Sequence, residues 1–335
     1  MKAIVCTEYG LPDILELKEV EKPTPKGDEV LVEVRASSVT THNLFLIQGK
    51  PFMIRLMNGG LRKPKIATPG SDMAGRVVAV GRNAKHFQPN DEVFGDLTPS
   101  GFGAFAEYVC VPQTVLTLKP TNLTFEEAAA VPQAALVALQ GLRDKGHIQK
   151  GNKVLIYGAS GGIGTFAVQI AKYYGAEVTG VCSTPNLSMV RSIGADHVID
   201  YMKEDFLKGG QAYDLIFAIA YRSIFDFRRA LTSQGIYVST GGPSMKRILQ
   251  DMVLGPMISK PEGKRLVGGW SLVPNKDLGF VKELIEARKI KPIIDRCYTF
   301  SEVAKAFRYY AEGHSRGKVV VTLQARSSAE LRGAV

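Results

Sequence analysis

A glycine-rich turn between a short apolar segment and a longer helical pattern is the feature that most constrains the fold of this chain. Residues 153–175 read KVLIYGASGGIGTFAVQIAKYYG. Residues 153–157 predict a strand, and apolar residues at helical spacing predict a helix over 165–174 that Gly175 ends. This order of strand, turn and helix is typical of a phosphate cradle, because the free N–H groups of the helix N-terminus point at the ligand.

The turn contains the residues that we expect to contact a dinucleotide. Gly161 lets the backbone approach a pyrophosphate, and Gly164 permits close contact between the helix and the strand. The predicted cofactor cradle comprises Ala159, Ser160, Gly161, Gly162, Ile163 and Gly164. The alternative is a tight turn that serves packing alone, but the strand and helix on either side favour the dinucleotide.

The end of the next predicted strand indicates which dinucleotide binds. NAD sites usually have Asp or Glu there, because a carboxylate holds the ribose hydroxyls. The strand over 177–182 is instead followed by Ser183 and Thr184, whose hydroxyls donate hydrogen bonds and do not repel a phosphate. Asn186 and Tyr201 add further donors. The sequence therefore favours NADP(H) over NAD(H).

Strands and helices alternate from residue 153 onward. The predicted strands are apolar and rich in β-branched residues, and they span 153–158, 177–182, 196–200, 213–220, 235–242 and 265–270. This pattern predicts an α/β protein with a doubly wound parallel sheet. Residues 1–120 predict a β-rich domain, with strands over 29–39, 75–81 and 105–112. After a helix over 276–289, the segment PIIDRCYTF, a helix over 302–312 and a strand over 317–323 are expected to return the chain to that domain.

Composition and charge narrow the class of protein. The 335 residues suffice for about two domains, and no apolar run approaches the roughly 20 residues of a membrane-spanning helix. The start lacks the pattern of a signal peptide, so we expect a cytoplasmic protein. The four Cys residues lie far apart, which argues against a Cys-only zinc site. The net charge of +10 comes without basic stretches interleaved with aromatic residues, so nucleic acid is not an expected partner.

The segment over 50–65, KPFMIRLMNGGLRKPK, combines large apolar residues with five Lys and Arg and no acid. Three interpretations stay open. It fits a mobile lid over a binding site, a patch that touches a membrane surface without insertion, or a solvated loop with a packed underside.

Five segments together give the chain a resemblance to a known family. They are TPGSDMAGRVVAVGRNAKHFQPNDEVFG (68–95), AAAVPQAALVALQGL (128–142), the glycine turn, GVCSTPNLSMVRSIGADHVIDY (180–201) and EGHSRGKVVV (312–321). The chain resembles a zinc-free medium-chain dehydrogenase/reductase of the quinone oxidoreductase type. The resemblance implies a GroES-like domain from residues 1–122 and 290–335, a Rossmann domain over 123–289 and a homodimer.

The resemblance also indicates whether this chain has the zinc ligands of the superfamily. Zinc-dependent members of this superfamily have Cys, His and Cys ligands at three positions, which correspond here to Thr40, Ser71 and Gln133. None of these is a usual zinc ligand. The family lobe with four clustered Cys is missing as well, so we expect no metal.

The segment over 37–49 departs from the family pattern. The resemblance implies Asn-Pro-x-Asp followed by an aromatic hydroxyl, whereas this chain has Thr40, Asn43 and Phe45. Thr40 and Asn43 still carry hydrogen-bond donors for a carbonyl oxygen that gains negative charge. His42 is a candidate proton source if it faces the site, and the alternative is a histidine with a packing role.

Three further residues complete the expected cofactor site. The resemblance implies that Gly241 and Gly242 lie near the nicotinamide and that Lys318 reaches the cofactor. Ala218–Tyr221 is a second departure, since relatives often have Asp-x-Val-Gly there.

The resemblance implies an NADPH-dependent, zinc-independent reductase of quinones or α,β-unsaturated carbonyls, with hydride transfer from the nicotinamide C4. Two alternatives stay open. One is an NADP(H)-binding scaffold or sensor with weak or lost catalysis, and the other is a member diverted to a specialised biosynthetic reduction.

Overall fold

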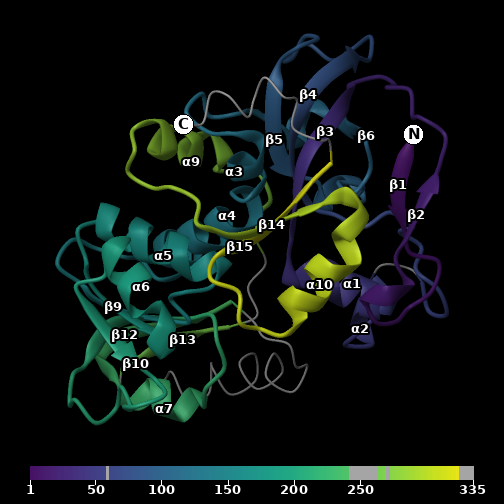
Figure 1. The fold of residues 1–335 in the computed structure, drawn as a ribbon. Helices are drawn as coiled ribbons and strands as arrows, with labels where there is room; N and C mark the ends of the chain where they lie inside the picture. Colours follow the sequence, from purple (N-terminus) through teal and green to yellow (C-terminus); the bar gives the residue numbers. More distant parts are fainter. Residues whose placement is uncertain (58–59, 241–262, 269–271, 324–335) are drawn as a thin grey trace. The chain divides into compact units, whose positions relative to one another are not determined.

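The computed structural model describes residues 1–57, 60–240, 263–268 and 272–323. The chain divides into two compact units (Figure 1). The first holds the described residues of Met1–Gln133, Pro274–Lys282 and Ile294–Val335, and the second those of Ala134–Val273 and Glu283–Ile293. The domain boundaries expected from the sequence, at 122/123 and 289/290, stay a prediction.

A seven-stranded sheet organises the first unit around one long strand, β3. The strand order is β14-β15-β3-β4-β5-β7, and β6 also pairs with β3. The strands are β3 (Glu29–Val39), β4 (Asp72–Val80), β5 (Glu92–Asp96), β6 (Tyr108–Pro112), β7 (Thr117–Leu118), β14 (Ile294–Thr299) and β15 (Lys318–Thr322). β3 is antiparallel to β4, β6 and β15. The C-terminal strand β15 therefore returns to the N-terminal part of the chain, as the sequence predicted.

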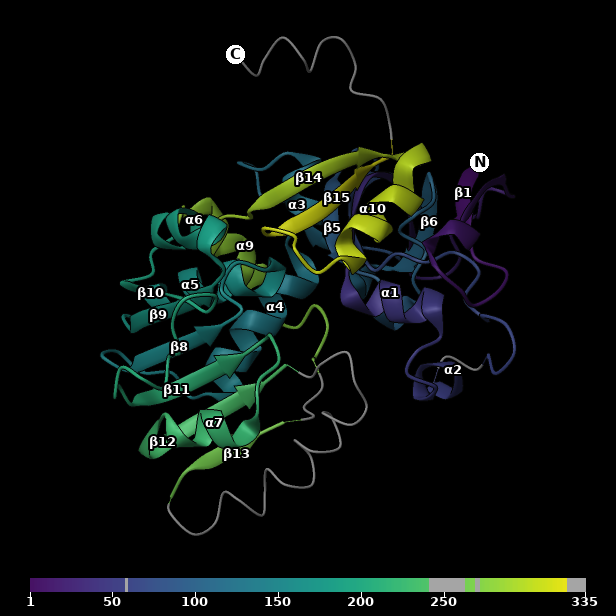
Figure 2. The same ribbon diagram turned by 60° about the horizontal axis from the view of Figure 1, so that its bottom comes forward.

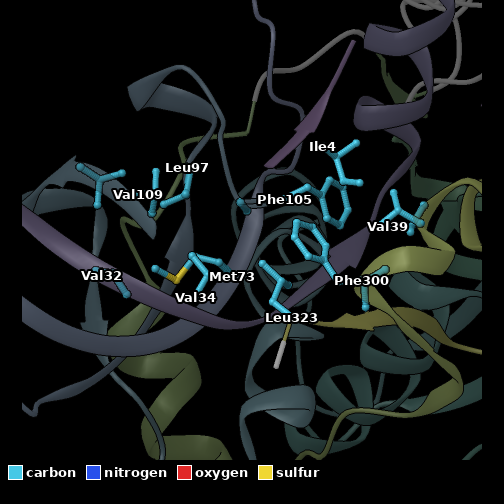
Figure 3. Packing of buried hydrophobic residues seen from close by; sticks show 14 of the residues in the cluster. Ile4, Val32, Val34, Val39, Met73, Leu97, Phe105, Val109, Phe300 and Leu323 are labelled. Carbon is cyan, nitrogen blue, oxygen red and sulfur yellow. The ribbon is translucent and has the colours of Figure 1, made fainter. Parts of the chain in front are cut away.

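The core of the first unit consists of alternate side chains of these strands (Figure 3). Val30, Val32 and Val34 of β3 are completely buried, as expected for β-branched residues on the inner face of a sheet. Phe105 and Phe307 meet edge to face, with their ring centroids 5.6 Å apart.

Short helices and one small hairpin complete the first unit. The hairpin pairs β1 (Lys2–Val5) with β2 (Glu16–Glu19). The α-helices are α1 (Thr41–Gln48), α2 (Met53–Met57), α3 (Phe125–Ala129) and α10 (Val303–Ala311), and the 3-10 turns are η1 (Pro12–Ile14), η2 (Thr98–Ser100), η3 (Gln113–Val115) and η6 (Phe300–Glu302). Thr124 and Glu127 form a capping box at the start of α3.

The second unit contains a six-stranded sheet in the order β10-β9-β8-β11-β12-β13, and Figure 2 shows these strands side by side. Every pairing in it is parallel, which confirms the predicted α/β class. The strands are β8 (Lys153–Tyr157), β9 (Glu177–Cys182), β10 (His197–Asp200), β11 (Tyr213–Ala218), β12 (Leu231–Ser239) and β13 (Arg265–Val267). With β8 as its first strand, this is the order of a doubly wound dinucleotide-binding sheet.

The helices that accompany this sheet are short apart from α5. They are α5 (Gly162–Tyr173), η5 (Thr184–Asn186), α6 (Leu187–Ser192) and α7 (Ile224–Arg229). The chain passes between the units in α4 (Pro132–Gln140), which continues into the π-helical turn η4 (Gly141–Lys145), and in α9 (Leu278–Glu286). Within the described ranges, no helix is long and apolar enough to cross a membrane.

Phe227 of α7 is the centre of an aromatic cluster in the second unit. Its ring lies 5.1 Å from Tyr237, 5.2 Å from Tyr157 and 5.8 Å from Phe206, and it is completely buried. Phe225, two residues earlier on the same helix, is 52% exposed. The two phenylalanines therefore form a matched pair for measuring what this packing contributes.

We expect Phe227→Ala to lower the free energy of unfolding by about 3–5 kcal/mol, because it removes a buried ring and leaves a cavity. Phe225→Ala should change it by less than about 0.5 kcal/mol. Urea unfolding of both variants measures the difference. Equal losses would show that α7 does not depend on this cluster.

Candidate functional site

The predicted phosphate cradle lies in the second unit, between β8 and α5. Gly158 has a positive φ of 97°, which lets the chain turn sharply at the end of the strand. α5 begins after Gly161, and no side chain caps it. The first N–H groups of a helix have no partners within that helix, so this end of α5 offers donors and a partial positive charge.

Gly161 and Gly164 have different physical roles in the cradle. A Cβ atom on Gly164 would lie 2.1 Å from the carbonyl oxygen of Gly158, so this position holds the helix against the turn. A Cβ atom on Gly161 would meet the same oxygen at 3.7 Å and, apart from its neighbours in the chain, no other heavy atom of the described residues within 4 Å. The surroundings of Gly161 are therefore open, as a site for a phosphate group requires. Ala159, Ser160, Gly162 and Ile163 are the other residues of this turn and of the start of α5.

Asn186 connects the cradle to the segment that follows β9. Its Nδ2 donates to the hydroxyl of Ser160 at 3.2 Å and to that of Ser183 at 3.0 Å. Its Oδ1 is buried and has no hydrogen-bond partner among the residues that the structure describes. Three of the residues singled out from the sequence therefore meet at one place, together with an unsatisfied acceptor.

Thr184 is held by a carboxylate that was not among the predicted site residues. Its hydroxyl donates to Oδ2 of Asp200 at 2.5 Å. Asp200 ends β10 and lies opposite Cys182 of β9 in the sheet register. The hydrogen bond from Thr184 lowers the pKa of Asp200, so this carboxyl is ionised at neutral pH. Tyr201, the next residue, is 54% exposed.

The preference for NADP(H) predicted from the sequence takes the absence of a carboxylate from the end of the second strand alone. Parallel strands end at the same edge of a sheet, so an acid that ends the third strand was the signal that could have found Asp200. Gly241 and Gly242, which were also expected to contact the cofactor, lie outside the described residues.

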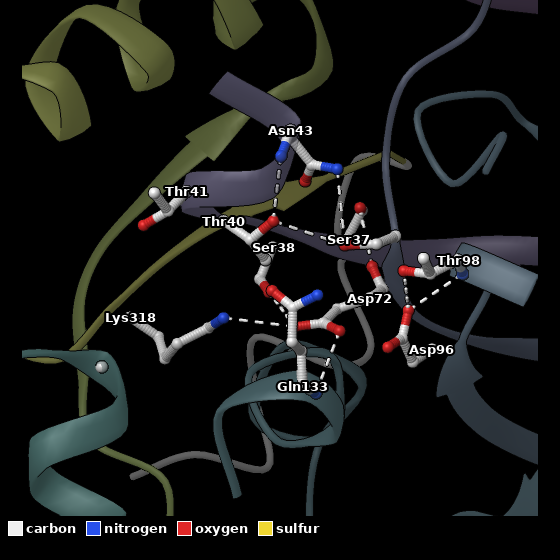
Figure 4. A network of polar contacts seen from close by, with 12 residues as sticks. Ser37, Ser38, Thr40, Thr41, Asn43, Asp72, Asp96, Thr98, Gln133 and Lys318 are labelled. Atoms are coloured by element: carbon white, nitrogen blue, oxygen red, sulfur yellow. Dashed lines mark hydrogen bonds and ion pairs between the residues drawn. The ribbon is translucent and has the colours of Figure 1, made fainter. Parts of the chain in front are cut away.

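The expected hydrogen-bond donors of the first unit come together where β3 ends and α1 begins (Figure 4). Thr40 caps α1, and its Oγ1 accepts the backbone N–H of Asn43 at 3.2 Å. The Thr40 and Ser71 hydroxyl oxygens are 3.4 Å apart, and Nδ2 of Asn43 donates to Ser71 Oγ at 3.4 Å. All three side chains are buried. We call Thr40, Asn43 and Ser71 the hydroxyl cluster.

Asn43 prepares both hydroxyls of this cluster to donate. It donates its backbone N–H to Thr40 Oγ1 and its side-chain amide to Ser71 Oγ, so each hydroxyl oxygen already accepts a hydrogen bond. One of the two hydroxyl hydrogens serves the contact between Thr40 and Ser71, and the other stays available to a ligand oxygen. Asn43 Oδ1 is buried without a hydrogen-bond partner.

His42 lies on α1 but makes no hydrogen bond to the hydroxyl cluster. Its ring meets Phe102 edge to face, with the centroids 5.2 Å apart. Burial lowers the pKa of His42, so the ring is neutral at pH 7. Its role as a proton source stays a prediction.

Lys318 is part of a buried polar network next to the hydroxyl cluster, and this network is centred on Asp72 (Figure 4). Oδ2 of Asp72 lies 3.2 Å from Lys318 Nζ and accepts the hydroxyl of Ser38 at 3.1 Å. Oδ1 accepts the backbone N–H of Gln133 at 3.1 Å. Asp72 is fully buried and Lys318 is 5% exposed. In this structure, therefore, Lys318 is the counter-ion of Asp72.

A second buried carboxylate, Asp96, lies opposite Asp72 in the sheet register. Its Oδ1 accepts the N–H and the hydroxyl of Thr98, whereas its Oδ2 is buried without a hydrogen-bond partner. Burial raises the pKa of Asp72 to about 6, although Lys318 opposes this shift. The pKa of Asp96 is raised by the same cause.

The three positions that correspond to zinc ligands in the superfamily lie in this region. Thr40 and Ser71 are in contact, and Gln133 donates its backbone N–H to Asp72, the neighbour of Ser71. Within the part of the chain that the structure describes, no three His, Cys, Asp or Glu side chains are arranged to hold a metal ion.

The raised pKa of Asp72 predicts a pH-dependent stability. The folded state keeps a proton on this carboxyl between its ordinary pKa of 3.8 and about 6. That stabilisation is complete below 3.8 and is lost as the pH rises through about 6. We therefore expect the free energy of unfolding of the wild type, relative to Asp72→Asn, to fall over this range in urea titrations.

A difference that stays constant with pH would contradict this assignment. Asp28→Asn, which removes an exposed carboxylate from the same unit, serves as the control.

Two family models match parts of this chain. The model of the alcohol dehydrogenase GroES-like domain matches residues 26–121, and the model described as zinc-binding dehydrogenase matches residues 193–321. The chain is 33% identical over 335 residues to the 2-methylene-furan-3-one reductase of Solanum lycopersicum, covering 96% of this chain and 79% of the relative.

A second relative and a solved structure point to the same family. The chloroplastic NADPH-dependent alkenal/one oxidoreductase of Arabidopsis thaliana is 33% identical over 333 residues, with coverage of 96% of this chain and 79% of the relative. The solved structure of the quinone oxidoreductase from Coxiella burnetii superposes with a TM-score of 0.86 at 27% identity, covering 97% of this chain and 99% of that one. The chain thus belongs to the medium-chain dehydrogenase/reductase superfamily of oxidoreductases, among its quinone oxidoreductase-like members.

Proposed function

We propose that this chain is an NADPH-dependent reductase of quinones or α,β-unsaturated carbonyls that uses no metal ion. The observation that carries the proposal is the open position at Gly161, at the uncapped N-terminus of α5 and at the end of the first strand of a doubly wound sheet. The printed names of the relatives, which include an alkenal/one oxidoreductase and a quinone oxidoreductase, support the same reaction class.

The residues of the second unit fit a nicotinamide dinucleotide. The N-terminus of α5 and the backbone at Gly161 would hold its pyrophosphate, because they combine N–H donors with space. Asn186 would meet the same ligand, since its buried Oδ1 lacks a partner. When bound, the cofactor supplies the hydride for the reduction.

The preference for NADPH rests on the end of β9, where Ser183 and Thr184 stand in place of a carboxylate. Asp200 opposes a phosphate at Thr184, because its negatively charged carboxylate lies beside this residue and accepts the Thr184 hydroxyl. Ser183 and Tyr201 are therefore the donors that we assign to a 2′-phosphate. Lys203, whose Nζ is 3.9 Å from Asp200, partly offsets the carboxylate charge.

The hydroxyl cluster would act on the substrate. A carbonyl oxygen gains negative charge when hydride arrives at a conjugated carbon, and a pre-oriented donor stabilises that charge. We assign this donation to the free hydroxyl hydrogen of Thr40 or Ser71. Asn43 then acts mainly as a positioning residue, because its backbone N–H and its side-chain amide already donate to the two hydroxyl oxygens.

Gly161→Ala tests the cofactor site without disturbing the fold. The added methyl group has room in the free protein, so the melting temperature should stay unchanged, whereas the affinity for NADPH in calorimetry should fall on the order of tenfold. Gly164→Ala should instead destabilise the chain by about 1–3 kcal/mol, since its Cβ would overlap a backbone oxygen. Unchanged NADPH affinity in Gly161→Ala would place the cofactor elsewhere.

Turnover of a naphthoquinone and a simple enone with NADPH tests the donor assignment. Thr40→Val should lower kcat on the order of a hundredfold, because it removes a donor to the developing charge, and Thr40→Ser should restore most of the activity. Thr41→Val is the matched control, since the hydroxyl of Thr41 is exposed and bonds that of Tyr310. Tight NADPH binding without turnover of either substrate would favour the scaffold or the specialised reductase.

A further inference from the structure

α2 and the two loops beside it expose four large apolar side chains. Leu11 is 69% exposed, Phe52 63%, Leu56 56% and Leu61 55%. Phe52 and Leu56 are one helical turn apart, so they lie on the same side of this segment. We call these four residues the α2 patch.

Tyr9 holds the three segments of the patch together. Its hydroxyl donates to the carbonyl oxygen of Gly60 at 2.5 Å, and its ring lies 4.5 Å from the guanidinium of Arg55. The N–H of Gly60 donates to Arg55 O at 2.9 Å, and Arg55 Nε donates to Gly49 O at 3.0 Å. The loop with Leu11, the helix with Leu56 and the loop with Leu61 are therefore neighbours. Figure 2 shows α2 beyond α1, at the outer edge of the first unit.

Exposed cations surround the patch. Lys50, Arg62, Lys63 and Lys65 are exposed, and none of them makes an ion pair with a described residue. No Asp or Glu occurs between Glu33 and Asp72 in the sequence.

Two acids lie near the fourth patch residue, Leu11. Asp13 is neutralised by Arg308 at 3.2 Å, and Glu8 is exposed. Among the described residues, four cations without an ion pair therefore outweigh one acid without an ion pair beside the patch.

We propose that the α2 patch docks this chain on the surface of an anionic lipid bilayer. Large aliphatic and aromatic side chains that project from a short helix enter the boundary between headgroups and acyl chains, while the cations beside them meet anionic headgroups. A folded chain that exposes four large apolar residues together usually covers them with a partner. Because the surrounding residues are mostly cationic, we expect that partner to be anionic.

This docking surface adjoins the hydroxyl cluster within the first unit. Thr40 and Asn43 lie at the N-terminal end of α1, and α2 follows its C-terminal end. An eight-residue helix is about 12 Å long, so one helix connects the two places. The inference does not depend on the proposed reductase activity, since the binding partner is the lipid itself.

Sedimentation with large unilamellar vesicles tests the proposal on the full chain. One set consists of phosphatidylcholine alone, and the other of equal amounts of phosphatidylcholine and phosphatidylglycerol. We expect binding to the mixed vesicles only, with an affinity that falls as salt is added. Failure to bind the mixed vesicles, or equal binding to both sets, overturns the proposal.

Two sets of substitutions separate the contributions. The triple variant Arg62→Gln, Lys63→Gln and Lys65→Gln should bind the mixed vesicles on the order of a hundredfold more weakly, at about fivefold for each cation. The double variant Phe52→Ser and Leu56→Ser should bind at least about tenfold more weakly, because it cannot enter the acyl boundary. All substituted residues are exposed, so the fold should persist, and circular dichroism checks this.

Phe225→Ser combined with Lys208→Gln is the matched control, because it removes an exposed aromatic residue and an exposed cation from the second unit. Its vesicle binding should equal that of the wild type. If the control loses as much vesicle binding as the α2-patch variants do, the proposal is overturned. The proposal also fails if the α2 variants leave vesicle binding unchanged and raise only the KM for a small water-soluble enone, because the segment is then a lid.

Discussion

The buried carboxylate of Asp72 is the constraint on which much of the first unit depends. An ionised group without water costs several kcal/mol unless charges and hydrogen bonds compensate it. Here the compensation comes from Lys318 on β15, Ser38 on β3 and the backbone of Gln133 at the start of α4. Four segments from distant parts of the chain must therefore assemble for this one group to be buried. The raised pKa shows that the compensation is incomplete.

The same network explains how the hydroxyl cluster is positioned. Ser71 directly precedes Asp72, and Thr40 follows the end of β3, which carries Ser38. Thr40 directly follows the strand and caps the next helix through its hydroxyl oxygen. Its capping bond with Asn43 occupies the oxygen and leaves the hydrogen to donate. The start of α1 and the proposed donation to the substrate therefore both depend on the hydrogen bond between Asn43 and Thr40.

Three glycines of the cradle in the second unit each meet a different physical requirement. Gly158 adopts a backbone conformation that residues with a Cβ rarely reach, Gly164 allows a contact that a Cβ would block, and Gly161 leaves space. Only the third requirement concerns a ligand directly. A glycine pattern in a sequence cannot separate these roles, because all three appear as the same residue type.

Local patterns determined a large part of this protein. The β-branched runs predicted β3 and β9 with their observed bounds, and the spacing of strand, glycine turn and helix predicted the cradle and the α/β class. These features depend on interactions between neighbours in the chain, which residue order specifies directly.

Tertiary structure alone decided which distant residues meet. Asp200 reaches Thr184 through the register of two parallel strands, and Lys318 reaches Asp72 across 246 positions of sequence. It also decided that Leu11 joins Phe52 and Leu56 in one exposed patch, through the contacts of Tyr9. Such pairings follow from strand order and from the cost of burying charge, and both are properties of the assembled chain and of no single segment.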